Sequence, residues 1–357
     1  MLKHFYSNLS VKKFRYIVLV LSVVFLSLAL LLYFRNRYVF ENLLFQETEQ
    51  RQLVIAKSGA LSINLFIENA DEDIRAISRL PEIYTLNVPS AEKTISGYLS
   101  GSTLSAISTI GLLDKNGKAL VIYDRTGMAS QVGQNFSDRD YFKWSEQPSS
   151  RGQTYITQPF VSRAGSTKGS NVIVVSSPVY NGNLYTGDLI FVISLDEFTK
   201  SFVSPLRINK GEVFLMDENG RYIAGDNNLI NVNLFNYADS NKWNNYKSFK
   251  DGLYEVVQSG NGIEKWDFKE PEKSSSETDL VGYQTIQRPG PDWYLVAAVP
   301  ESSELSVIND FYFNQRIIAI YLILVFLAFA ITYITRDSIS RKEFFMEGYK
   351  RAKRDKD

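Results

Sequence analysis

The chain has 357 residues, 45% of them hydrophobic, and its 39 Lys and Arg balance its 39 Asp and Glu. This length allows a large core or two domain-sized units, and the balanced charge indicates no nucleic-acid partner. The chain has no cysteine, and its single histidine is His4, near the N-terminus. These counts exclude disulfides, thiolate metal sites and a multi-histidine metal site, and they argue against a Ser-His-Asp triad. We therefore expect no catalytic residues, no bound metal and no cofactor in this chain.

Two apolar runs without a charged residue lie near the ends of the chain, at 16–34 and 317–334. As a helix the first would span about 28 Å, close to the roughly 30 Å hydrocarbon core of a bilayer. The alternative for the first run is a cleaved signal peptide, because basic residues precede it. The run is longer than a signal-peptide core, however, and no small-residue cleavage site follows before Arg35. The sequence therefore predicts two transmembrane helices.

Basic residues flank both predicted spans on the terminal side. Lys3, Lys12, Lys13 and Arg15 precede the first span, and a basic segment, 335–357, follows the second. Because cytoplasmic flanks are enriched in Lys and Arg, we expect residues 1–15 and 335–357 in the cytoplasm and residues 35–316 outside it. An external domain of this size without cysteine fits a bacterial periplasm, with the spans in the inner membrane.

A helical pattern opens the extracytoplasmic segment, over residues 35–82. Apolar residues recur mostly at intervals of three or four and their sums, at Val39, Leu43, Leu53, Ala56, Ala60, Ile63, Ile67, Ala70, Ile74 and Ile77. Pro81 cannot extend the helix, so we expect it to end there. One face should pack on its own domain, and another could form the seam of a homodimer.

The middle of the chain contains an internal repeat. The turn sequence D-x-N-G joins two apolar runs at residues 114–117 and again at 217–220, and each copy is followed by a late strand, at 187–195 and 293–299. Asn-Gly between apolar runs is a strong hairpin signal. The repeat predicts two tandem α+β lobes, 83–205 and 206–305, each with an antiparallel sheet. The stretch 271–278 is predicted as a solvated hairpin loop.

These features resemble the double Cache (dCache) sensor domains of bacterial transmembrane signalling proteins. The segments that carry the resemblance are 136–143 (FSDRDYFK), 154–160 (TYITQPF), 172–180 (VIVVSSPVY) and 292–300 (DWYLVAAVP). The resemblance covers about residues 38–305. It implies an α+β fold with two tandem PAS-like antiparallel-sheet lobes on a long N-terminal helix, flanked by two transmembrane helices. The lobe at 83–205 would be membrane-distal and the lobe at 206–305 membrane-proximal.

The resemblance also implies a ligand site in the distal lobe. Arg139 would match the arginine that holds a ligand carboxylate, Tyr141 and Phe142 the aromatic pair beside it, and Tyr155 the aromatic residue on the next strand. A guanidinium suits bidentate carboxylate recognition, and aromatic walls shape and desolvate a small pocket.

Purely structural interpretations of these residues stay open. Arg139 could be a surface arginine paired with Asp138 or Asp140, which is common and contributes little. Tyr141 and Phe142 could simply belong to the core, as aromatic residues on a helix usually do.

The sequence departs from the amino-acid-binding members of the family at one position. Those members carry an aspartate in the closing strand of the distal lobe, which pairs with the amine of the ligand. The matching position here is Val192. Because a free α-amino group would then lack a partner, we expect a carboxylate without an amine, another small molecule, or no ligand.

The resemblance predicts a dimeric transmembrane sensor that binds a small molecule and signals across the inner membrane. In relatives the second membrane helix leads into a diguanylate cyclase, a histidine kinase or a chemoreceptor coiled coil, and residues 335–357 contain none of these. An output enzyme could follow Asp357, so whether the whole protein is an enzyme stays open. The alternative function is a membrane-anchored scaffold that uses the Cache fold to hold a cytoplasmic or periplasmic protein partner.

Overall fold

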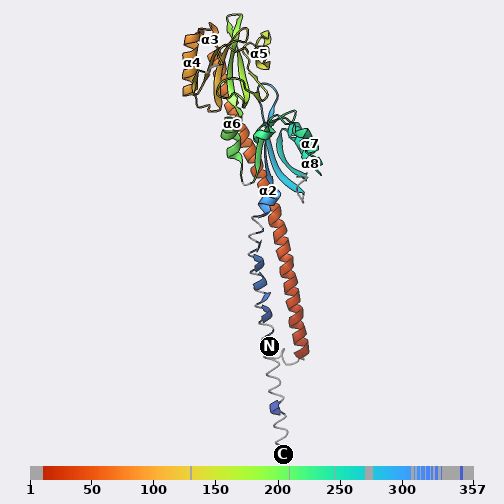
Figure 1. Cartoon of the computed structure of the whole chain (residues 1–357). Coiled ribbons are helices and arrows are strands. Elements are labelled where there is room, and N and C mark those ends of the chain that lie inside the picture. The colour runs from red at the N-terminus through yellow and green to blue at the C-terminus, as the bar shows by residue number, and fades with distance from the viewer. Residues whose placement is uncertain are drawn as a thin grey trace, which may run out of the picture. The chain divides into compact units, whose positions relative to one another are not determined.

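The computed structural model describes residues 11–306 apart from 129–130, 209, 245 and 270–275, together with scattered residues after 306. Contacts divide the chain into two compact units, Met1–Ser303 and Glu304–Asp357. The first unit contains one long helix and two antiparallel sheets (Figure 1). This confirms the predicted α+β fold with two tandem PAS-like lobes on a long N-terminal helix.

The long helix α2 runs from Val11 to Ser78. Its predicted apolar face is buried in the second half of the helix, at Ala56, Ala60, Ile63, Ile67, Ala70, Ile74 and Ile77, whereas Val39 and Leu43 are exposed. The helix ends at Ser78, close to the predicted end. Pro81 opens the short helix α3 (Pro81–Tyr84), where a residue without an N–H is tolerated because the first turn has no intrahelical acceptor for it.

Within the described residues, no helix has both the length and the apolar character needed to cross a bilayer. The first predicted span, 16–34, falls inside α2. The second, 317–334, and the predicted tail, 335–357, lie partly or largely outside the described residues. Both spans stay predictions.

The first lobe is built on an antiparallel sheet with the strand order β3-β2-β1-β7-β6-β4, in which β5 also pairs with β6. Its strands are β1 (Ile107–Asp114), β2 (Ala119–Asp124), β3 (Gly127–Met128), β4 (Tyr155–Ile156), β5 (Phe160–Val161), β6 (Asn171–Asn181) and β7 (Leu184–Ser194). Helices α3 and α4 (Val88–Gly101) lie on one face of this sheet, and α5 (Asp140–Ser145) lies on the other (Figure 1). The α5 face has its own apolar cluster.

The second lobe repeats this arrangement with the strand order β10-β11-β12-β8-β9. Its strands are β8 (Glu212–Asp217), β9 (Tyr222–Ala224), β10 (Asn261–Phe268), β11 (Glu277–Ile286) and β12 (Trp293–Pro300). One face packs on α2, and the other is covered by α7 (Tyr237–Ser240) and α8 (Lys247–Ser259). In both sheets the two repeat strands lie beside the late strand, as β2-β1-β7 and β9-β8-β12. The short helix α6 (Leu195–Phe198), a π-helical turn (Thr199–Val203) and a 3-10 turn (Ser204–Leu206) lead from one sheet to the next.

The two D-x-N-G turns have the same hydrogen bonds. In each turn the aspartate, Asp114 or Asp217, accepts at Oδ1 from the backbone N–H groups two and four residues later, all at 2.9 Å. The glycines Gly117 and Gly220 have φ values of 78° and 74°, which a residue without a side chain adopts at little cost. Both predicted hairpins are confirmed. Strand β10 pairs with β11 across the predicted loop 271–278, but Glu277 and Thr278 already belong to β11, and residues 271–275 of that loop lie outside the described residues.

The lobes share an apolar core and are also joined by polar contacts. A single apolar cluster runs along α2 and includes residues of both sheets, among them Ile110 of the first and Trp293 of the second. Arg288, in the loop before β12, stacks on the Trp293 ring at 4.4 Å and donates from Nη1 to the carbonyl of Ile156 at 3.4 Å. The second lobe therefore touches strand β4 of the first directly.

Candidate functional site

A small cavity lies on the α5 side of the first sheet. Strands β1, β2, β6 and β7 form its floor, and the segment leading into α5 and the loop between β5 and β6 form its other walls. Its lining is Thr109, Gly111, Leu113, Ile122, Phe136, Arg139, Tyr141, Phe160, Ser162, Arg163, Ala164, Val172, Val174, Ile190 and Val192. The cavity measures about 30 Å³, which is room for roughly two water molecules. A larger ligand would require these walls to move outward.

The predicted site residues fall into two pairs. Arg139 and Tyr141 line the cavity, and Tyr141 is only 3% exposed. Phe142 and Tyr155 do not line it. Phe142 is fully buried in the apolar cluster beside the cavity, and Tyr155 stacks on the Trp144 ring at 5.4 Å.

Arg139 occupies the N-cap position of α5, with an extended backbone at φ −76° and ψ 144°. Its guanidinium lies over the Phe160 ring at 4.6 Å, and Nη2 donates to the carbonyl of Val161 at 3.5 Å. Both contacts are with strand β5, so they connect the start of α5 to this strand. Within the described part of the chain it pairs with neither Asp138 nor Asp140.

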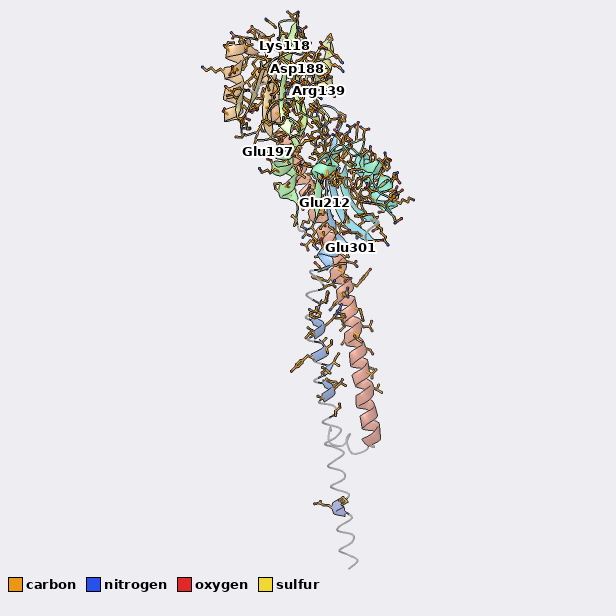
Figure 2. All side chains as sticks on the ribbon, in the orientation of Figure 1. Lys118, Arg139, Asp188, Glu197, Glu212 and Glu301 are labelled. Atoms are coloured by element: carbon orange, nitrogen blue, oxygen red, sulfur yellow. The ribbon has the colours of Figure 1, made fainter. Side chains whose placement is uncertain are left out.

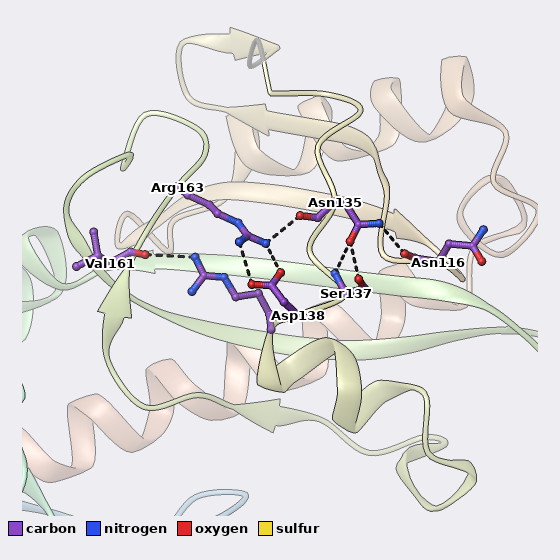
Figure 3. A network of polar contacts seen from close by, with 7 residues as sticks. Asn116, Asn135, Ser137, Asp138, Val161 and Arg163 are labelled. Atoms are coloured by element: carbon purple, nitrogen blue, oxygen red, sulfur yellow. Dashed lines mark hydrogen bonds and ion pairs between the residues drawn. The ribbon is translucent and has the colours of Figure 1, made fainter.

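A second arginine lines the cavity, Arg163 in the loop between β5 and β6. It forms a two-pronged ion pair with Asp138, in which Nη1 lies 2.9 Å from Oδ2, and Nη2 donates to the carbonyl of Asn135 at 2.8 Å (Figure 3). Its guanidinium also lies over the Phe136 ring at 4.8 Å. The hydrogen bonds from Arg163 hold the pKa of Asp138 below its ordinary value, so this carboxylate is ionised at neutral pH.

Three polar groups at this cavity are buried and have no hydrogen-bond partner among the described residues: Thr109 Oγ1, Arg139 Nε and Arg163 Nε. The β5–β6 loop packs closely over Thr109, because a Cβ added to Gly165 of this loop would lie 2.8 Å from Thr109 Oγ1. A buried donor without an acceptor costs free energy. An acceptor group placed in the cavity would therefore be stabilised by these three side chains.

A buried carboxyl group lies on the same face of the sheet but does not line the cavity. Asp188 of β7 is fully buried, and both of its carboxyl oxygens lie 2.9 Å from Ser176 Oγ, which in turn lies 2.8 Å from Ser145 Oγ. Burial raises the pKa of Asp188 well above its ordinary value. Burial, followed by the nearby Asp188, raises the pKa of Tyr141 as well. Figure 2 shows Asp188 and Arg139 in the same lobe.

None of the described residues that line the cavity is acidic. Val192, which stands where amino-acid-binding relatives are expected to carry an aspartate, is among the lining residues. The cavity therefore combines two guanidinium groups and the hydroxyls of Thr109, Tyr141 and Ser162 with aromatic and aliphatic walls, and its described lining has no carboxylate to pair with a ligand amine. This arrangement suits a small anion with an apolar body.

Sequence reasoning did not identify Arg163 or Thr109 as site residues. Arg163 lies in a loop that has no apolar periodicity and no recognisable motif. Thr109 is a single polar residue within an apolar strand, and nothing in the local sequence marks it as a site residue. Only the tertiary fold places both beside Arg139.

Comparisons with known proteins agree with this fold. Residues 40–306 match the family model of the double Cache type, described as "Cache domain". The chain matches none of the curated proteins.

Solved structures of sensor domains are similar in fold. The periplasmic sensory domain of the Campylobacter jejuni chemoreceptor Tlp1 aligns with a TM-score of 0.57 at 14% identity, over 73% of this chain and 98% of that one. The ligand-binding domain of the Pseudomonas fluorescens chemoreceptor CtaA, solved with L-serine, aligns with a TM-score of 0.51 at 15% identity, over 72% and 99%. An extracellular ligand binding receptor from Desulfohalobium retbaense DSM5692 aligns with a TM-score of 0.49 at 13% identity, over 68% of this chain but only 39% of that one. The chain thus spans less than half of that last relative.

The family match covers most of the chain and includes both lobes and the cavity, and the strand order repeats from one lobe to the next. This chain belongs to the Cache-domain family of sensor domains, in its double form.

Proposed function

We propose that this chain is the sensor of a transmembrane signalling protein, and that the cavity of its first lobe binds a small carboxylate that carries no amine. The observation that carries the proposal is that three residues lining one cavity each have a buried donor with no partner among the described residues: Thr109 Oγ1, Arg139 Nε and Arg163 Nε. A carboxylate would supply acceptors to all three, and charge-assisted hydrogen bonds to guanidinium are among the strongest available. The apolar walls would cover the rest of the ligand.

Ligand binding would act by shifting a conformational equilibrium. Because a cavity of about 30 Å³ is too small for most metabolites, a ligand would favour a state in which the segment before α5 and the β5–β6 loop lie further apart. Strand β4 contacts the second lobe through the hydrogen bond from Arg288 to Ile156, and Thr154, the residue before β4, donates a hydrogen bond to Asp71 of α2. These contacts offer a route by which movement at the cavity could reach the long helix.

The first prediction concerns Arg139. We expect small monocarboxylates to raise the thermal midpoint of the purified full chain, and Arg139→Met to reduce their affinity by about 100-fold, since a lost hydrogen bond to a charged group is worth roughly 1.5–3 kcal/mol. The measurement is a thermal-shift screen of small carboxylates and amino acids, followed by calorimetric titration of the compounds that bind.

Arg151→Met is the matched control, because Arg151 lies in the same lobe and is exposed, with its contacts to Asn183 and Gly182 away from the cavity. It should bind like wild type. If amino acids bind and carboxylates without an amine do not, the proposed ligand class is wrong. If binding survives in Arg139→Met, the role of this arginine is wrong.

The placement in the membrane also belongs to this proposal. The spans 16–34 and 317–334 would cross the bacterial inner membrane, with 1–15 and 335–357 in the cytoplasm and the sensor domain 35–316 in the periplasm. The lobe 83–205 would be membrane-distal, and the part of α2 from residue 35 to Ser78 could form the seam of a homodimer. The output would be that of a chemoreceptor, a histidine kinase or a diguanylate cyclase that follows this chain.

A pair of reporter fusions tests this topology in a bacterial host. Green fluorescent protein fused after Asp357 should fluoresce, because it folds in the cytoplasm. Alkaline phosphatase inserted after Gly182, an exposed turn residue between β6 and β7, should be active, because it requires the oxidising periplasm. The opposite result for either reporter would contradict the proposed orientation.

A further inference from the structure

The charges around the cavity set the number of negative charges that a ligand can carry. Among the described residues that line it, only Arg139 and Arg163 are charged, and they contribute two positive charges. Both guanidiniums are held in place by aromatic rings, Arg139 over Phe160 and Arg163 over Phe136. Neither charge can therefore leave the cavity without losing these contacts.

The two arginines differ in their pairing. Both carboxylate oxygens of Asp138 accept hydrogen bonds from Arg163 (Figure 3), and the side chain of Asp138 is 61% exposed. Arg139 has no carboxylate partner among the described residues. One of the two positive charges is thus neutralised by the protein, and one is left for the ligand.

The contacts of Arg163 also determine which of its N–H groups remain available. Nη2 donates to both Asp138 and the carbonyl of Asn135, and Nη1 donates one of its two N–H groups to Asp138, whereas Nε is buried without a partner among the described residues. A ligand acceptor can therefore take the Nε–H of Arg163 without displacing Asp138. A second carboxylate on the ligand would have to displace Asp138 to obtain a two-pronged pair, and it would meet the negative charge of Asp138.

We propose that Asp138 is a specificity-determining residue, which neutralises Arg163 and thereby restricts the cavity to monocarboxylates with an apolar body. This inference rests on the proposed function of the cavity as a carboxylate site. A dicarboxylate would bring one negative charge more than the site can compensate, so it is rejected by repulsion as well as by lack of a partner. Removing the carboxylate of Asp138 should convert Arg163 into a second anchor and admit dicarboxylates.

The test uses ligands matched in length and shape, butyrate against succinate and benzoate against terephthalate, titrated calorimetrically into the full chain. For wild type we expect the monocarboxylate of at least one pair to bind at least tenfold more tightly than its dicarboxylate. In Asp138→Asn the ratio of the dicarboxylate Kd to the monocarboxylate Kd should be at least tenfold lower than in wild type. Arg163→Met should weaken monocarboxylate binding by at least tenfold, because Asp138 then remains unpaired beside the cavity.

The double variant Asp138→Asn/Arg163→Met separates charge from shape. It has the same charge balance as wild type at this site, so it should recover monocarboxylate binding relative to Arg163→Met and keep the preference for one carboxylate. Asp140→Asn is the control. Asp140 lies two residues after Asp138, is exposed and does not pair with Arg163, so the substitution removes an equal charge without affecting the ion pair. It should leave the ratio as in wild type.

The outcomes distinguish this inference from the proposed function. If a monocarboxylate binds and requires Arg139, but Asp138→Asn leaves the ratio unchanged, the inference is overturned and the carboxylate site stands. If Asp140→Asn changes the ratio as much as Asp138→Asn, the effect is general electrostatics, and the inference is likewise overturned. If none of the four probes binds wild type or any variant, the inference fails, and the broader screen with Arg139→Met decides whether the proposed function fails with it.

Discussion

Replacing Gly282 with alanine is expected to destabilise the protein by about 3 kcal/mol or more, at the upper end of what overpacking costs. Gly282 lies in β11 where this strand crosses α2, and a Cβ added there would lie 2.2 Å from the backbone nitrogen of Leu53 and 2.3 Å from the carbonyl carbon of Gln52. These are main-chain atoms inside a helix, so they cannot move aside as a side chain could. The strand and the helix must separate, and the apolar cluster along α2 must open with them. Denaturant unfolding of the full chain, followed by circular dichroism, measures the effect.

The control for this prediction is Gly97→Ala. Gly97 lies in α4 and is exposed, and an added Cβ would meet nothing within 4 Å. Because alanine has the higher helix propensity, this variant should be stabilised by roughly 0.5–1 kcal/mol. A Gly282→Ala variant as stable as wild type would show that α2 does not lie directly against β11.

Asp188 is expected to make the protein less stable as the pH rises. Burial raises its pKa in the folded state well above the value near 3.9 that an aspartic acid has when unfolded. Between these two pKa values the folded protein holds one proton more than the unfolded chain. The stability that this neutral acid contributes is therefore fully present below the unfolded pKa, and it is lost as the pH rises through the folded pKa. Within that window the loss is about 1.4 kcal/mol per pH unit.

Asp188→Asn should remove this slope, because its amide does not titrate and can still hydrogen-bond to Ser176. The free energy of unfolding, measured from pH 4.5 to pH 8, should become less dependent on pH in this variant than in wild type. Asp251→Asn is the control, since Asp251 is exposed on α8, and it should keep the wild-type slope. Equal slopes for wild type and Asp188→Asn would show that Asp188 is ionised in the folded protein, and that its place in the sheet is more hydrated than the structure indicates.

The fold could be predicted from the sequence, and two of the four residues predicted for the site, Arg139 and Tyr141, line the cavity. The two D-x-N-G hairpins were predictable because a turn depends on neighbouring residues, on the Asp side chain that caps it and on the glycine that tolerates a positive φ. The buried face of α2 was predictable from Ala56 onward because helical periodicity is also a local property. Arg139 and Tyr141 were predicted through the resemblance to the Cache family, which also led to Phe142 and Tyr155, two residues outside the cavity lining.

The remaining features depend on contacts between residues far apart in the chain. The local sequence does not indicate which loop packs over which strand. The ion pair between Arg163 and Asp138 and the position of Thr109 in the cavity lining are therefore visible only in the tertiary structure. The same reason applies to Gly282. A side chain at this position would clash with the backbone of a helix that lies more than 200 residues earlier in the chain. By itself the sequence determined the elements, their repetition and the family of this protein. The tertiary structure decided which charges and donors share the cavity, because that depends on distances that only packing sets.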